Sequence, residues 1–255
     1  MRNIKYLIFA LFLFIPFAVS ADEIYSVNMS LDLDKYGNAN VVEKWNVKAS
    51  GGTEWYKAYY NLKNTKIENY KVSMDDTPLK EKNPWDVNGS LSDKKGYYGI
   101  NETSNGPELC FGKSDMNKHI FTMEYTFKNL VYTTEDSDII YLTLLPEATV
   151  RSFQVNVKGF YTFPDSLDVW GYGYKGYAYV KDGKITMTNE DGLDDEYVVL
   201  LVKFPKGTFT TTNTLSEFTN FEAVKALADE GSFEQDYSDY GYNDYCDHSD
   251  YYDAS

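Results

Sequence analysis

A strict alternation of apolar and polar residues marks the stretch Val27-Asn28-Met29-Ser30-Leu31-Asp32-Leu33-Asp34. After the turn Asp34-Lys35-Tyr36-Gly37-Asn38, the alternation returns over residues 39–48, with Glu43 as the one charged residue on the apolar side. Successive side chains of a β-strand point to opposite faces of the sheet. The pattern therefore predicts an antiparallel hairpin with one buried face, one solvent-facing side and a glycine-bearing turn.

The same signal recurs along the chain as far as about Pro205. Residues 119–127 alternate in the same way, and residues 139–146 and 197–204 are continuous apolar runs of strand length. About ten short strands are separated by turns, with no helical pattern among them. This arrangement predicts an all-β fold, an antiparallel β-sandwich over residues 22–210, built either as one large sandwich or as two tandem ones.

A different pattern follows the β region. The spacing Thr219-Asn220-Phe221-Glu222 fits a capping box, and Gly231 fits a helix stop, so we expect a short amphipathic helix over residues 215–231. Residues 232–255 are rich in Asp and Tyr and almost lack aliphatic side chains. Such a segment cannot bury enough surface to fold, and the sequence predicts a disordered acidic tail.

The first residues predict a secretory signal peptide over residues 1–21. Arg2 and Lys5 give a positive start, residues 7–19 are almost wholly apolar, and Val19-Ser20-Ala21 offers small residues for cleavage. The apolar run is too short for a comfortable bilayer span, and no later segment reaches that length. We expect an extracellular or cell-surface location, with membrane attachment only if the signal is retained or an anchor is supplied elsewhere.

The overall charge limits the partners. The chain has 39 acidic and 24 basic residues, which gives a formal net charge of -15. Because phosphate contacts require a positive face, a nucleic-acid partner is excluded. The two cysteines, Cys110 and Cys246, are too few for a disulfide framework, and they are left as either a single bridge or free thiols.

The sequence carries no catalytic signature. His119 and His248 are its only histidines, and neither lies near a Gly-x-Ser-x-Gly element. Cys110 with His119 could in principle form a nucleophile pair, although no family signature surrounds them. Ligand-spaced His and Cys are also lacking, so no zinc site is expected. We therefore predict no catalytic residues and no cofactor.

Two segments remain as candidate binding sites. The first is an oxygen-rich loop that could gather calcium ligands or could simply be solvated; its acidic residues are Asp191, Asp194, Asp195 and Glu196. The second is a Tyr/Gly-rich stretch that could stack on sugar rings or could serve as cross-strand packing. Its ligand-binding candidates are Trp170, Tyr172, Tyr174 and Tyr177.

The order of these features resembles a known family. Gly37, Val41 and Glu43 match the dG-x-x-x-V-x-E pattern in its first hairpin, and the segment Phe121-Thr122-Met123-Glu124-Tyr125-Thr126-Phe127-Lys128-Asn129-Leu130 lies in the corresponding order. Over residues 22–230 the chain resembles the N-terminal extracellular domain of the bacterial predicted membrane protein family, domain of unknown function 2207. Members typically carry a transmembrane helix after this domain, whereas here the acidic tail follows Gly231. The resemblance implies an envelope location and no established catalytic residues.

These observations favour an exported, non-enzymatic β-sandwich of the bacterial cell envelope that binds an envelope protein or a glycan. One alternative is a carbohydrate-active enzyme that works through paired carboxylates. Another is a carbohydrate-binding module, which would expose coplanar Tyr or Trp rings.

Overall fold

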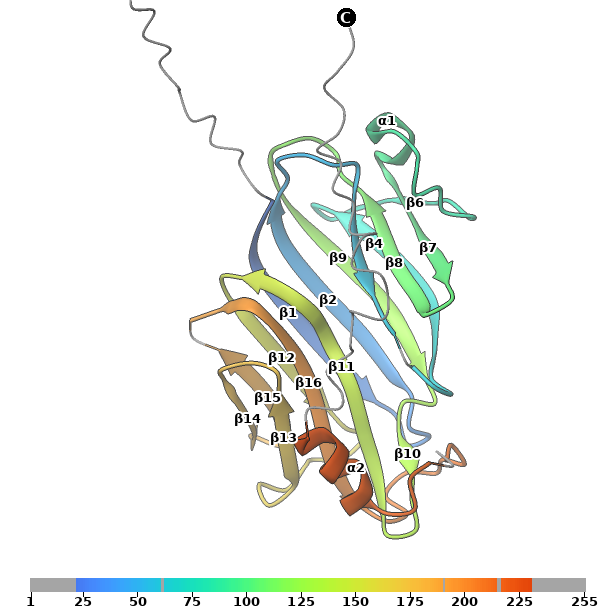
Figure 1. Cartoon of the computed structure of the whole chain (residues 1–255), viewed down its shortest axis with the longest axis vertical. Coiled ribbons are helices and arrows are strands. Elements are labelled where there is room, and N and C mark those ends of the chain that lie inside the picture. The colour runs from blue at the N-terminus through green and yellow to red at the C-terminus, as the bar shows by residue number, and fades with distance from the viewer. Residues whose placement is uncertain (1–21, 61, 190, 215–216, 231–255) are drawn as a thin grey trace, which may run out of the picture.

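The computed structural model describes residues 22–60, 62–189, 191–214 and 217–230. A large eight-stranded sheet is covered on one face by two four-stranded sheets (Figure 1). The large sheet has the order β14 (Tyr177–Lys181), β15 (Lys184–Asn189), β12 (Phe153–Lys158), β1 (Glu23–Leu33), β2 (Ala39–Lys48), β9 (Lys118–Lys128), β4 (Lys66–Met74) and β5 (Thr77–Pro78). The β7–β8 sheet consists of β3 (Glu54–Ala58), β8 (Gly106–Gly112), β7 (Tyr97–Thr103) and β6 (Lys80–Glu81). The β11–β16 sheet consists of β10 (Tyr132–Thr133), β11 (Ser137–Val150), β16 (Leu193–Pro205) and β13 (Asp168–Tyr172).

One continuous apolar core fills the space between the large sheet and both small sheets. Phe111 of β8 packs on Phe121 of β9 with ring centroids 4.7 Å apart. Under the β11–β16 sheet, Leu200 of β16 belongs to the same core as Phe153 of β12. Burial of this apolar surface is the main force that holds the sheets together. Because the core is continuous, the predicted sandwich is confirmed as one large unit.

The two apolar runs identified in the sequence become β11 and β16, which pair with each other. Alternate residues of β16, such as Leu200, face the large sheet, while Leu201 belongs to a second cluster on the opposite side. Both faces of these strands are therefore covered. A strand that is buried on both faces needs apolar residues at every position, which explains why these runs do not alternate.

The strand directions differ from the prediction in two places. β1 pairs with β2 in the antiparallel direction, as expected, but it pairs with β12 in the parallel direction. β6 and β7 are also parallel. Parallel neighbours need a long crossover connection, and the chain passes through both small sheets between β1 and β12. The period of a strand reports its faces and carries no information on its direction.

The helices are α1 (Leu91–Lys94) and α2 (Phe221–Asp229). The predicted helix near the end is confirmed, but its N-cap is Asn220 and not Thr219, because the extended Asn220 accepts a hydrogen bond from Ala223 N at 3.0 Å. The expected helix stop, Gly231, lies outside the described residues, as do the predicted signal peptide and tail. α1 was not expected, since its four residues lie in an irregular segment. Neither described helix is long and apolar enough to span a membrane.

Candidate functional site

The most distinctive surface is the outer face of the large sheet at the β14 end. Register places Tyr177 opposite Thr188 and Tyr179 opposite Thr186. Strand pairing continues the two rows through β12 and β1, with one residue from each strand in each row. We call these eight side chains the polar face: Tyr177, Thr188, Gln154 and Asn28 in one row, and Tyr179, Thr186, Asn156 and Ser30 in the next.

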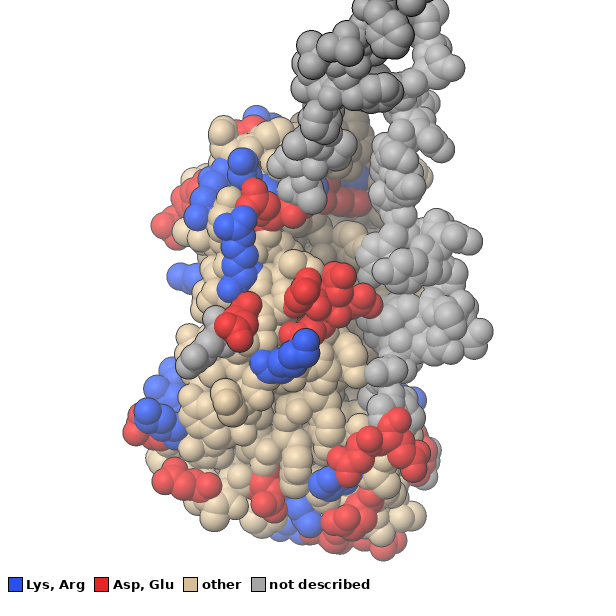
Figure 2. Space-filling model, turned by 60° about the vertical axis from the view of Figure 1, so that its left-hand side comes forward, with Lys and Arg blue, Asp and Glu red and all other residues tan. Residues whose placement is uncertain are grey.

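The polar face arises from period-two alternation on four adjacent strands. Residues between its members, such as Met29, Val155 and Met187, point inward and are buried in the core. Tyr177 is 69% exposed and Tyr179 is 40% exposed. All eight side chains are uncharged and can form hydrogen bonds. Figure 2 shows the side of the molecule where β13, β14 and β15 lie, with a tan area bordered by Lys, Arg, Asp and Glu side chains.

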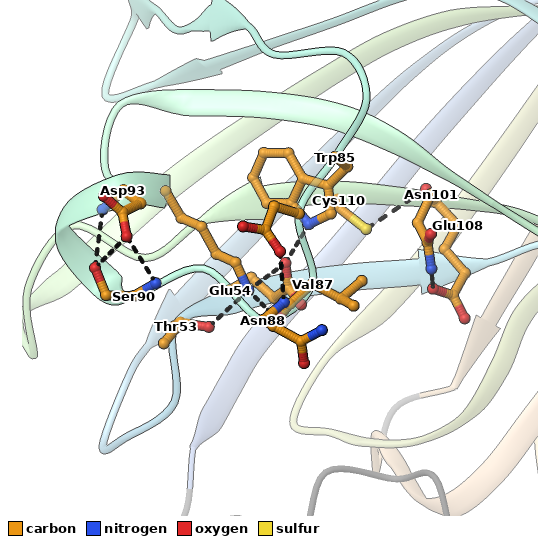
Figure 3. Close-up of polar contacts among 12 residues, drawn as sticks. Thr53, Glu54, Trp85, Val87, Asn88, Ser90, Asp93, Asn101, Glu108 and Cys110 are labelled. Atoms are coloured by element: carbon orange, nitrogen blue, oxygen red, sulfur yellow. Dashed lines mark hydrogen bonds and ion pairs between the residues drawn. The ribbon is translucent and has the colours of Figure 1, made fainter.

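The outer face of the β7–β8 sheet, by contrast, has its own cover. The segment that contains Trp85 and α1 folds over it, and Trp85 Nε1 donates a hydrogen bond to Glu54. Figure 3 shows Glu54, Trp85 and Val87 around the same point. Lys94, only 1% exposed, donates to Val87 O at 2.6 Å and pairs with Glu54 at 3.2 Å. These bonds satisfy a buried cation and fix the covering segment.

The outer face of the β11–β16 sheet is covered by α2. Trp170 of β13 lies against Phe221 with ring centroids 5.3 Å apart. Tyr172 donates from its hydroxyl to Asp229 Oδ1 at 2.9 Å. Two of the four aromatic ligand-binding candidates from the sequence therefore pack beneath a helix, where they are half-buried.

The other two aromatic candidates are placed differently from each other. Tyr174 packs edge-on against Phe153 at 6.0 Å, and its hydroxyl donates to Tyr177 O at 2.9 Å. Tyr177 alone of the four projects from the polar face. The candidate residues chosen from the sequence left out Tyr179, its neighbour on the same side of β14, although the Tyr/Gly-rich stretch runs as far as that residue. The signal that could have found it is the two-residue spacing between Tyr177 and Tyr179.

The candidate calcium loop does not gather its carboxylates. Asp195 accepts a hydrogen bond from Thr149 Oγ1 at 2.9 Å, and Glu196 accepts one from Lys175 N at 3.2 Å. Among the described residues there is no group of three or more His, Cys, Asp or Glu side chains that could hold a metal ion. Within the described residues, no metal-binding group is therefore formed by Asp191, Asp194, Asp195 and Glu196.

A buried ion pair, which the sequence reasoning did not predict, connects the large sheet to the β7–β8 sheet. Glu43 and Lys57 are both fully buried, and Lys57 Nζ donates to the two carboxylate oxygens at 2.8 and 2.7 Å. Trp45 Nε1 donates to Oε1 at 2.6 Å, and the Tyr125 hydroxyl donates to Oε2 at 2.8 Å. With donors on both oxygens, Glu43 is held as a carboxylate. The misplaced charge of Glu43 in the alternation was the only sequence signal of this network.

The proton on each hydroxyl of this network follows from the donor count. Tyr125 has one hydroxyl proton, which goes to Glu43, so Tyr59 donates in the 2.6 Å contact between the two hydroxyls. The remaining side of the Lys57 ammonium faces the Tyr59 ring at 4.8 Å from its centroid. Burial lowers the pKa of Lys57, while Glu43 opposes that shift. The network is internally satisfied and structural in character.

Cys110 and His119 do not form a nucleophile pair. Cys110 is buried, and burial raises the pKa of its thiol, with Glu54 and Glu108 adding to the shift. Figure 3 shows Cys110 turned toward Asn101. His119 Nδ1 contacts Asp75 Oδ2 at 2.6 Å and its Nε2 contacts Asp115 Oδ1 at 2.9 Å. Both ring nitrogens are thus engaged with carboxylates, and Cys246 lies outside the described residues.

The His119 contacts predict a pH-dependent contribution to stability. Partial burial disfavours the imidazolium, but the hydrogen bonds and charges of Asp75 and Asp115 outweigh it, so the pKa of His119 is raised above 6.5. The raised pKa means that the contribution is fully present below pH 6.5 and is lost as pH rises through the folded-state pKa. His119→Gln should therefore destabilise the chain more at about pH 5.5 than at about pH 9 in urea unfolding. An equal loss at both values would contradict this assignment.

Comparison with solved structures gives distant matches. No protein-family model matches the chain, and no curated protein matches it in sequence. The chain is similar to yeast leukotriene A4 hydrolase with 8% identity and a TM-score of 0.47, over 72% of this chain and 29% of the hydrolase. It is also similar to an M1 zinc metallopeptidase from Deinococcus radiodurans with 10% identity and a TM-score of 0.38, over 72% of this chain and 42% of that one. The chain thus spans less than half the length of either enzyme.

Proposed function

We propose that this chain is an exported, non-enzymatic binding domain of the bacterial cell envelope, and that it binds through the polar face. The observation that carries the proposal is that the outer faces of two sheets are covered by other parts of the chain, whereas the polar face is open. Both small sheets have their outer faces covered, by the Trp85 segment and by α2. In the described part of the chain, the four strands of the polar face keep their outward side chains open to solvent. A broad open face is suited to a large partner.

The interior groups support a non-enzymatic role. The carboxylates buried among the described residues belong to Glu43 and Asp138. Glu43 is neutralised by Lys57. Asp138 accepts hydrogen bonds from Thr133 Oγ1 at 2.8 Å and Phe209 N at 2.9 Å. Each is committed to protein donors, as expected of structural groups and unlike the poised acid and base of a glycosidase.

The envelope location rests on the predicted signal peptide and on the family resemblance over residues 22–230. An acidic chain with a net charge of -15 stays soluble outside the cytoplasm and is repelled by anionic membrane surfaces. A neutral or basic component of the envelope is therefore the kind of partner that this domain would meet without electrostatic repulsion.

The proposal is tested by cosedimentation of the full chain with purified bacterial envelopes. Asn28→Arg places a bulky charge at the β1 end of the polar face and should weaken retention by about tenfold, which corresponds to about 1.4 kcal/mol. Asn88→Arg, on the exposed loop over the β7–β8 sheet, is the matched control and should bind like the unmodified chain. Absence of retention, or equal retention of both variants, would refute binding through this face.

A further inference from the structure

We propose that the ligand of the polar face is a neutral polysaccharide chain, which lies across the strands and stacks on Tyr177 and Tyr179. This inference rests on the proposed binding function and adds the chemical class of the partner. It follows from the chemistry of the eight side chains and from the dimensions of the area that they cover.

The side chains have the properties that sugar recognition needs. The hydroxyls of Thr186 and Thr188 donate to Asn156 Oδ1 at 3.3 Å and Phe153 O at 3.4 Å, so their oxygens can accept from a ligand. The side chains of Ser30, Asn28 and Gln154 can both donate and accept hydrogen bonds. Sugar hydroxyls have the same dual character, so each can be matched without a charged group. At the strand edge, two exposed tyrosine rings offer flat apolar surfaces with a polar tip, which can cover the C–H face of a pyranose ring.

The eight side chains of the polar face carry no charge. Charged residues border them on the same face: Lys44 lies opposite Asn28, and the next row holds Asp32 opposite Lys158 and Lys181 opposite Lys184. A phosphorylated or sulfated ligand would need Lys or Arg within the patch, and a basic peptide would need Asp or Glu. The polar face contains none of these among its eight residues. The large negative charge of the whole chain further disfavours an anionic glycan.

The geometry favours a chain over a single sugar. Neighbouring strands lie about 4.8 Å apart, so four strands give a strip roughly 14 Å long across the sheet. Two rows on the same face are separated by two residues, or about 7 Å. The strip is open at the surface of the sheet, so it cannot enclose a monosaccharide. Affinity should therefore rise with the number of sugar units until the strip is filled.

A titration of the full chain with neutral oligosaccharides tests the inference, with glucose, xylose, mannose and N-acetylglucosamine series of increasing length as probes. At least one series should bind, with longer chains binding more tightly. Tyr177→Ala should weaken this binding about tenfold, which corresponds to about 1.4 kcal/mol. Tyr177→Phe retains the ring and should bind within about threefold of the unmodified chain. Tyr36→Ala, at a 53% exposed site in the β1–β2 turn, is the control and should have no effect.

The outcomes separate this inference from the proposed function. If envelopes retain the chain through the polar face but none of the neutral series binds, the glycan inference fails and a protein partner replaces it. If Tyr177→Ala and Tyr36→Ala weaken oligosaccharide binding equally, the stacking role fails. If envelopes do not retain the chain at all, the proposed function fails as well. Each variant should unfold in urea at the same denaturant concentration as the unmodified chain. A loss of binding then results from the changed surface and not from unfolding.

Discussion

Lys57→Met is expected to destabilise the chain by about 3–5 kcal/mol, because it leaves the Glu43 carboxylate buried without its counter-charge. Glu43 and Lys57 are both fully buried, and the ion pair measures 2.7 Å. Trp45 and Tyr125 would still donate to Glu43, but two neutral donors do not replace an ammonium. Urea unfolding of the variant and the unmodified chain gives the difference in the free energy of unfolding.

Two further variants make this prediction specific. Lys44→Met removes a lysine from the exposed face of the same region of β2 and should change stability by less than about 0.5 kcal/mol. The double variant Glu43→Leu with Lys57→Met removes both charges and should recover much of the loss, since buried pairs can be replaced by apolar residues at little cost. A single variant within about 1 kcal/mol of the unmodified chain would show that the pair contributes little.

Phe111→Ala is the second change with a large expected effect, a loss of about 3–5 kcal/mol. Phe111 is fully buried where β8 meets the large sheet, with its ring 4.7 Å from Phe121 and 6.0 Å from Trp45. Its truncation leaves a cavity that the two sheets cannot close by moving independently, because the Glu43–Lys57 pair joins them close by. Lys57 lies opposite Leu109, two residues before Phe111 on β8.

The control for this prediction is Ile120→Ala. Ile120 precedes Phe121 on β9 but points to the opposite face and is 47% exposed. Its truncation should cost less than about 1 kcal/mol in urea unfolding. If Phe111→Ala were no more destabilising than Ile120→Ala, the β7–β8 sheet would not be an integral part of the core.

The sequence was sufficient to predict the β-sandwich, because alternation reports directly which side of a strand is buried. Glu43 interrupted that alternation, which is the mark of a buried charge, but its partner Lys57 lies 14 residues away in a short strand with no pattern of its own. The sequence left the Tyr/Gly-rich stretch as either a sugar-stacking surface or cross-strand packing. In the structure, Trp170 and Tyr172 pack against α2, while Tyr177 is exposed on the edge strand β14. This difference depends on where the helix docks, which sequence periodicity does not encode.

The polar face itself could not be predicted from one sequence. Its eight residues come from segments around positions 28, 155, 178 and 187, which become neighbours only through the pairing of four strands. The contact between β1 and β12 is parallel and joins strands more than 100 residues apart in the chain. Each segment alone shows only an ordinary exposed strand face.

Hydroxyl-radical footprinting of the chain bound to purified envelopes tests the central claim that binding occurs through the polar face. Oxidation of Tyr177 and Tyr179 should fall several-fold on binding, while Tyr36, which is 53% exposed in the β1–β2 turn, should react at the same rate as in the free chain. Unchanged oxidation of Tyr177 in the bound chain would contradict the account, as would protection of Tyr36 in its place.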